Sequence, residues 1–216
     1  MPNRCTDPPP DKPFPAFTYN ETAWTAAGYT NIRVFGPDRS TPCTDARNYL
    51  QGTGAGTYGA QSAPTVIRVT GTCSSPLTIT SQVTVRNDLA ILNDGPVSSQ
   101  LGISFNSNTG LVSDNSKPIH NVFVFAAASR GLGDVTSNCN FAMSSNAHFR
   151  GGLRAVVRTP CAASFPSNVN ILDGQIFARS VSISSNSTMT YYSLDVPGAP
   201  ISGFHQDIVY TREIPN

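Results

Sequence analysis

The stretch "MSSNAHF" at residues 143–149 recurs forty residues later as "ISSNSTM" at 183–189. Each copy begins with an apolar residue, continues through serines and an asparagine, and ends on another apolar residue. A weaker copy, "ITSQVTV" at 79–85, keeps the apolar residues at the same two places. Because each unit is too short to bury its own apolar face, such repeats are typical of stacked architectures.

The repeats predict that equivalent side chains lie above one another on neighbouring strands, about 4.8 Å apart. We expect one interior column of Ile79, Met143 and Ile183, and a second of Val85, Phe149 and Met189. Asn146 and Asn186 then fall at matching corners, where asparagine tolerates a left-handed backbone conformation.

Short alternating runs outside the repeats extend the same interpretation. Three triples of strands are expected, at 65–71, 77–85 and 88–92, at 133–137, 141–149 and 153–159, and at 174–180, 181–189 and 190–196. Between the first and second triples, 101–112 and 120–128 are expected to supply a less regular turn of the same kind. The fold class predicted from this pattern is all-β, a single-stranded parallel β-helix (solenoid) of about four coils with short N-terminal capping helices.

The expected organisation has three parts. Residues 1–18 are a Pro-rich linker, residues 19–64 form an N-terminal cap, and residues 65–216 form the β-solenoid with a C-terminal strand at 204–215. In the cap, Asn20 is an N-cap candidate for a helix that carries Trp24 and stops at Gly28, and a second helix runs from Thr44 to before Gly52. We expect both helices, with Trp24 and Tyr29, to cover the first coil, because open strand edges invite aggregation.

The composition excludes several classes of partner. Charged residues are 12% of the 216 residues, against roughly 25% in ordinary soluble domains. The formal net charge is +1, and the twelve Arg and two Lys form no basic run, so nucleic acid is not an expected partner. No apolar run reaches the ~20 residues of a membrane span, and no leader opens the chain.

The five cysteines favour disulfides. No CxxC pair is present and the histidines are not at zinc-ligand spacing, so no metal site is expected. We predict the pairs Cys43 with Cys73 and Cys139 with Cys161, with Cys5 left over. The alternative is that all five are reduced and buried.

Catalytic patterns are missing from the sequence. Asp88, Asp134 and Asp173 precede strands, where turn formation explains them, although a glycosidase would need two facing carboxylates. His148 stands where the next repeat has Thr188, which favours an exposed, replaceable site. We therefore expect no catalytic, cofactor-binding or metal residue.

Three further surface features are hypotheses. Tyr191 and Tyr192 are candidates for surface binding, although one of two adjacent strand residues points inward. Asn20-Glu21-Thr22 and Asn186-Ser187-Thr188 match the glycosylation sequon. Thr78, Thr80 and Thr84 suggest an ice-binding face, but no TxT pair recurs in every coil.

The strand region also resembles a known class of proteins. The runs "VIRVTGTCSSPLTITSQVTVRNDLAIL", "NCNF", "VVRTPC", "GQIFARSVSISSNSTMTYYSLDVPG" and "DIVYTREI" look like the exported solenoid domain of actinobacterial surface proteins with a type IV pilin-like or other membrane anchor. The resemblance covers residues 20–216, and the anchor itself is absent from the sequence. It implies display at the cell surface and association with pilus subunits, cell-envelope components or extracellular glycans, with no catalytic residues to carry over.

Two functions follow as expectations. The leading hypothesis is a non-enzymatic extracellular structural or adhesive module, associated with a pilus or the envelope. The alternative is a carbohydrate-active or carbohydrate-binding protein with a groove along one face. A fold alone cannot decide between them.

Overall fold

A computed structural model describes residues 17–52, 54–114, 119–135, 137–184 and 187–199. Cys5, Asn186 and the strand expected at 204–215 lie outside the described residues. Twelve strands form one sheet. The strands are β1 (Asn31–Phe35), β2 (Thr65–Val69), β3 (Leu77–Ile79), β4 (Val83–Val85), β5 (Leu89–Asn93), β6 (Ile103–Phe105), β7 (Gly110–Ser113), β8 (His120–Ala126), β9 (Phe141–Met143), β10 (His148–Phe165), β11 (Asn170–Ile183) and β12 (Thr188–Tyr191).

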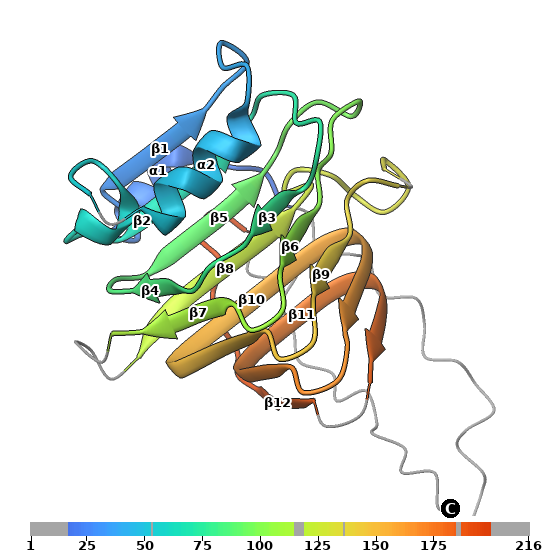
Figure 1. Ribbon diagram of the computed structural model, residues 1–216. Helices are drawn as coiled ribbons and strands as arrows, with labels where there is room; N and C mark the ends of the chain where they lie inside the picture. The colour runs from blue at the N-terminus through green and yellow to red at the C-terminus, as the bar shows by residue number, and fades with distance from the viewer. Residues whose placement is uncertain (1–16, 53, 115–118, 136, 185–186, 200–216) are drawn as a thin grey trace, which may run out of the picture.

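All ladders between these strands are parallel, and three runs of strands meet on β10 (Figure 1). The first run is β1-β2-β5-β8, the second is β3-β6-β9, and the third is β4-β7. β7 of the third run pairs with the first part of β10. β8 of the first run pairs with the middle of β10, and β9 of the second run pairs with its end. β11 and then β12 follow β10.

The predicted parallel β-helix of about four coils is wrong. The eight-strand path β1-β2-β5-β8-β10-β9-β6-β3 curls into an open half-barrel, and the sheet is not divided into coils. The breaks that the sequence predicted between strands are missing here, because hydrogen bonding continues through the bends. β10 therefore runs over 18 residues and β11 over 14. The strands expected separately at 174–180 and 181–189 therefore belong partly to one strand.

The expected alignment of repeats is partly right. Ile79 pairs with Phe105, and Phe105 pairs with Met143, so the less regular turn expected at 101–112 supplies a strand between the first two copies. Ile183 pairs with Phe165 of β10. In the other column Phe149 pairs with Leu111, and Leu111 pairs with Val83 rather than Val85.

The corner asparagine explains the repeated phrase and identifies two further copies, one inside the less regular turn expected at 101–112 and one at 165–171 that the sequence analysis did not single out. Asn108, Asn146 and Asn168 have φ angles of 59°, 61° and 63°. They sit in "FNSNTGL" (105–111), "MSSNAHF" (143–149) and "FPSNVNI" (165–171). Asparagine tolerates this left-handed conformation better than most residues do.

Alternation of side chains builds one interior core. β3, β6 and β9 each show a buried, half-buried, buried pattern, as expected for a strand with one face inward. Their inward residues are fully or almost fully buried, and Phe105 and Phe141 have ring centroids 6.0 Å apart. Burial of large apolar side chains contributes about 1.5–3 kcal/mol each and stabilises the curled sheet.

Two α-helices and one short 3₁₀ helix accompany the sheet: α1 (Glu21–Ala26), α2 (Pro42–Gln51) and η1 (Tyr58–Ala60). Asn20 caps α1 as predicted, because its side chain accepts a hydrogen bond from the Ala23 amide. α2 starts two residues before the expected Thr44 and ends before Gly52.

The two helices occupy different places. α2 covers one end of the interior, where Ala46 and Leu50 join the main core cluster. α1 instead lies on the outer face of the sheet, because Trp24 packs against Phe123 of β8 with ring centroids 5.4 Å apart. The expectation that Trp24 and Tyr29 cover the first coil is therefore wrong.

Both predicted disulfides are present. Cys43–Cys73 and Cys139–Cys161 have Cα–Cα distances of 5.6 and 5.5 Å, in the usual range for a disulfide. The first ties α2 to the segment after β2. Among the described residues, no helix is both long and apolar enough to cross a membrane.

Candidate functional site

An extended polar surface lies on the outside of the run β3-β6-β9 and continues onto the ends of β10 and β11. We call it the hydroxyl face. Its first row is in register across five strands: Thr78, Ser104, Ala142, Ser164 and Ser182. Two residues further along each strand stands the second row: Thr80, Asn106, Ser144, Pro166 and Ser184. All ten residues are half-buried or exposed.

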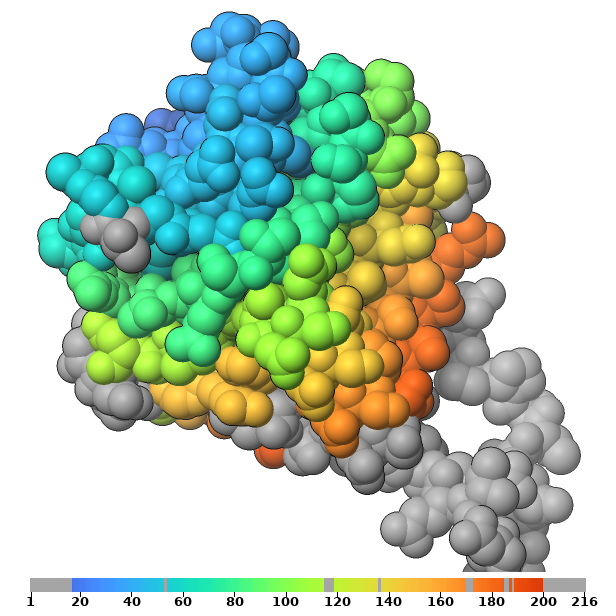
Figure 2. Space-filling model, viewed as in Figure 1, coloured from blue at the N-terminus to red at the C-terminus, as the bar shows by residue number. Residues whose placement is uncertain are grey.

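Backbone hydrogen bonds keep residues of the second row in register. The amide of Asn106 donates to Ile79 O at 2.9 Å, and that of Ser144 donates to Phe105 O at 2.8 Å. The Ser184 amide donates to Phe165 O at 2.9 Å. The parallel ladder therefore extends through the second row, and successive residues lie about 4.8 Å apart. Figure 2 shows the segments as adjoining bands, from green through yellow to orange.

Hydrogen bonds within the face fix some of its hydroxyls. Ser104 Oγ donates to Thr78 Oγ1 at 2.9 Å, and Thr80 Oγ1 donates to Gln51 Oε1 of α2 at 3.3 Å. A hydroxyl can accept as well as donate. These side chains therefore keep hydrogen-bonding capacity for a ligand.

Charge is segregated away from this face. The five segments that build it and its flanking turns contain no Asp, Glu, Lys or Arg: 69–85, 95–113, 135–149, 159–172 and 180–194. The charged residues belong to the other segments of the chain. A neutral surface recognises its partner by hydrogen bonds and shape, so salt should affect its binding little.

The tyrosines singled out from the sequence lie at a different place. Tyr191 pairs with Gly174, which pairs with the buried Ala155, so Tyr191 occupies an inward-facing position but is 50% exposed. Tyr192 follows on the outer side, and its ring centroid lies 3.4 Å from the guanidinium carbon of Arg154. The surface-binding role suggested for the two tyrosines stays a prediction, and neither residue belongs to the hydroxyl face.

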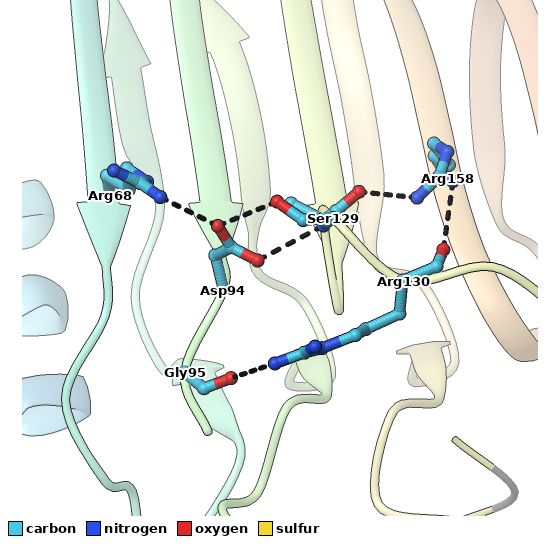
Figure 3. A network of polar contacts seen from close by, with 7 residues as sticks. Arg68, Asp94, Gly95, Ser129, Arg130 and Arg158 are labelled. Atoms are coloured by element: carbon cyan, nitrogen blue, oxygen red, sulfur yellow. Dashed lines mark hydrogen bonds and ion pairs between the residues drawn. The ribbon is translucent and has the colours of Figure 1, made fainter. Parts of the chain in front are cut away.

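A polar network joins the carboxyl ends of β2, β5 and β8 to β10 (Figure 3). Asp94 accepts a 2.9 Å bond from Arg68 Nη2, a 3.1 Å bond from the Ser129 amide and a 2.8 Å bond from Ser129 Oγ. Arg158 donates to Ala128 O at 2.6 Å and to Arg130 O at 3.0 Å. Burial lowers the pKa of Arg158 to about 10. These donors and acceptors are used in holding strand ends together.

A histidine between two carboxylates is the main constellation that the sequence did not suggest. His120 is fully buried, with Nδ1 4.0 Å from Asp88 Oδ1 and Nε2 3.8 Å from Asp114 Oδ1. Asp88 Oδ1 also accepts a 2.9 Å bond from the Asn121 amide. An acid–base residue must reach its substrate, and the His120 ring has no exposed surface. The arrangement therefore supports the sheet.

The other expectations about polar residues have mixed outcomes. The interpretation of His148 as an exposed site is wrong: it is buried, 6% exposed, and its Nδ1 lies 3.1 Å from Asn146 O at the corner. Thr78 and Thr80 lie on the hydroxyl face, whereas Thr84 lies on β4. In the described part of the chain, no group of three or more His, Cys, Asp or Glu side chains could hold a metal ion.

Two hollows on the surface have volumes of about 160 and 130 Å³. Pockets for small organic ligands are usually about 300–1,000 Å³. The described residues that line the two hollows include no Asp or Glu, so neither holds a carboxylate pair.

Comparisons with family models, curated proteins and solved structures find no match to this chain. The hydroxyl face is therefore interpreted from its own chemistry.

Proposed function

We propose that this protein is a non-enzymatic extracellular structural or adhesive module that binds a neutral surface through the hydroxyl face. The observation that carries the proposal is the in-register array on five parallel strands, in which eight of the ten side chains are short, uncharged and polar. A rigid array of this kind presents many weak hydrogen bonds at once without the cost of ordering long side chains.

The disulfides support the extracellular part of the proposal, because such bonds persist mainly in oxidising compartments. Association with a pilus or the cell envelope rests on the resemblance of the strand region to actinobacterial surface proteins. The partner would then be an envelope component or another subunit.

The composition of the face also favours a second candidate, a carbohydrate-binding module. Hydroxyl and amide groups match the donors and acceptors of a neutral glycan, and the absence of charge disfavours acidic polysaccharides. A linear glycan lying across the strands would meet at least one polar side chain of the two rows at every strand.

Binding assays can test both candidates. Beads coated with the protein are incubated with purified bacterial cell-wall sacculi and, separately, with insoluble cellulose and chitin, at low and at ~1 M salt. Ser164→Arg adds a long, positively charged side chain to the hydroxyl face, and Thr84→Arg adds the same side chain on β4. We expect binding that survives salt, falls about tenfold in Ser164→Arg and is unchanged in Thr84→Arg.

Each outcome has a clear meaning. Binding to sacculi alone supports the structural or adhesive module, and binding to cellulose or chitin supports the carbohydrate-binding module. Equal binding by the two arginine variants would refute the role of the hydroxyl face. Release of soluble sugars from any of these substrates would show an enzyme instead.

A further inference from the structure

The Cys43–Cys73 disulfide lies at the surface hollow of about 130 Å³. Both cysteines line this hollow, which is formed by the first turn of α2, the residues before it and the segment after β2. The other side chains around it are short and carry no charge: Ser40, Thr41, Pro42, Thr44, Thr72, Ser74 and Ser75. A small polar molecule can therefore approach this disulfide while the chain stays folded.

The Cys139–Cys161 disulfide lies in different surroundings. It belongs to an apolar cluster of five buried residues, and Cys139 is 0% exposed. Cys161 and Cys73 are both 4% exposed, so the exposed fraction alone does not separate the two disulfides. Neither of the two hollows, however, is lined by Cys139 or Cys161. Val135 O also lies 3.9 Å from Cys161 Sγ, and the partial negative charge of a carbonyl oxygen disfavours a thiolate beside it.

The start of α2 favours negative charge on Cys43. Cys43 follows Pro42 in the first turn of this ten-residue helix, and the Thr41 side chain does not cap the turn. The first amides of a helix have no partner within the helix, so they and the helix dipole stabilise a thiolate that lies beside them. Asp45 in the same turn opposes this effect, but its carboxylate is paired with Arg39 at 3.2 Å.

A buried amide approaches the same sulfur. Asn93 is 0% exposed, and its Nδ2 lies 4.0 Å from Cys43 Sγ. The same nitrogen donates to Gln100 O and Gly102 O, each at 3.2 Å. Because hydrogen bonds to an ionised acceptor are stronger than those to a neutral one, the contact should strengthen when Cys43 becomes a thiolate. Cys43 is therefore the better leaving group of its pair.

We propose that Cys43–Cys73 is an exchange site for small thiols and that Cys139–Cys161 is not. In the first step, the thiolate of an incoming thiol forms a bond to Cys73 Sγ, the bond between the two cysteines breaks, and the electron pair leaves on Cys43 Sγ. In the second step, another thiolate attacks the sulfur of the first thiol and releases Cys73. The two incoming thiols are oxidised to one disulfide, and their protons end on Cys43 and Cys73.

Exchange at this site makes the fastening of α2 reversible. The disulfide links residues 30 apart, and without it α2 is held by the apolar contacts of Ala46 and Leu50 with the core. Local opening of a helix becomes easier when a cross-link at its start is removed. The inference goes beyond the proposed function and does not depend on what the hydroxyl face binds.

Timed reduction of the folded full chain tests the proposal. Free thiols are blocked first, the chain is incubated with 2-mercaptoethanol, and samples are quenched with acid and mapped by mass spectrometry of peptides. We expect Cys43–Cys73 to open at least about tenfold faster than Cys139–Cys161, with the mixed disulfide on Cys73. Equal rates, faster opening of Cys139–Cys161, resistance of both disulfides or a mixed disulfide on Cys43 would each overturn the proposal.

Two variants of Ser74 distinguish attack in the hollow from reduction of an unfolded chain. Ser74 is exposed and lines the hollow next to Cys73. Because the attacking thiolate is an anion, Ser74→Lys should speed its exchange about threefold and Ser74→Glu should slow it about threefold. The rate at Cys139–Cys161 in the same samples is the internal control and should not change. Equal rates at Cys43–Cys73 in the two variants, or a parallel change at both disulfides, would overturn attack in the hollow.

Discussion

The end of the sheet that α2 covers and the open end, where β11 and β12 leave large apolar side chains exposed, are built from similar residues but differ in exposure. Leu50 on α2 is 2% exposed, whereas Ile183 on β11 is 55% exposed. In Figure 1, α2 crosses the first end beside β1 and β2, and β11 and β12 lie at the other. The comparison teaches that a parallel sheet supplies interior columns but not their ends. Each end needs a separate cover, and the first one is a helix fastened by a disulfide.

The largest expected difference between the ends concerns side-chain truncation. Leu50→Ala should lower the free energy of unfolding by about 2–5 kcal/mol, because it leaves a cavity under α2. Ile183→Ala should cost about 1 kcal/mol, since more than half of the Ile183 side chain is already exposed and its truncation leaves no enclosed cavity. Urea unfolding measures both. Equal losses would show that the two ends are covered alike.

Removal of the disulfide at the covered end should have the next largest effect. Cys43→Ala with Cys73→Ala removes a cross-link between residues 30 apart and should cost about 2–4 kcal/mol. Faster amide exchange should be strongest in α2, and exchange in β11 should change little. An equal increase of amide exchange in α2 and β11 would contradict a selective stabilisation of this end by the disulfide.

Alkaline pH should weaken the covered end through Tyr58. Burial raises the pKa of both Tyr58 and Tyr29 well above 10, so the folded protein keeps protons that the unfolded chain releases. Their stabilisation is complete below pH 10 and is lost as pH rises through the folded pKa values. Arg158, with its pKa lowered to about 10, acts in the opposite direction and offsets one of the two tyrosines.

Burial also raises the pKa of Tyr19, so the net effect should be a loss of at least about 1.4 kcal/mol per pH unit above pH 10. Urea unfolding at pH 9 and pH 11 measures it, and Tyr58→Phe, which removes one titrating group, should reduce the loss by about 1.4 kcal/mol per pH unit. A loss in Tyr58→Phe as steep as in wild type would exclude Tyr58 as the cause.

The smallest expected effects come from substitutions of the corner asparagines. These effects should be similar at the two ends of the sheet. Asn108→Ala and Asn168→Ala should each cost about 1 kcal/mol, because alanine disfavours the left-handed conformation at both sites. Glycine at the same positions should restore most of that stability. A much larger loss of stability in Asn108→Ala than in Asn168→Ala would contradict this expectation and show that the corners differ between the two ends.

Local features of the fold were predictable where the signal depended on neighbouring residues. The Asn20 cap, the boundary of α2 at Gly52 and the left-handed Asn146 follow from side-chain chemistry within a few residues. The disulfide pairs were also correct. The β-helix prediction failed because short polar corners between repeats suggested breaks that the ladders of β10 and β11 pass through.

The hydroxyl face could be predicted only in part. The repeats placed Thr78 and Thr80 next to apolar residues, but 101–112 was expected only as a less regular turn, and the copy at 165–171 was missed because Pro166 alters it. Without these copies, the rows of polar side chains looked discontinuous. Asp88, Asp114 and His120 gave no signal, because their association depends on segments that only the sheet brings together.

The sequence by itself determined the alternation of apolar and polar residues, the corner asparagines and the absence of charge from five segments. The tertiary structure alone decided which apolar residues are shielded from water. Ile79 and Ile183 occupy the same place in two copies of one phrase, yet Ile79 is 0% exposed and Ile183 is 55% exposed. The physical reason is that burial depends on neighbours from distant parts of the chain: α2 covers the β3 end, whereas Ile183 lies on the last strand of its row.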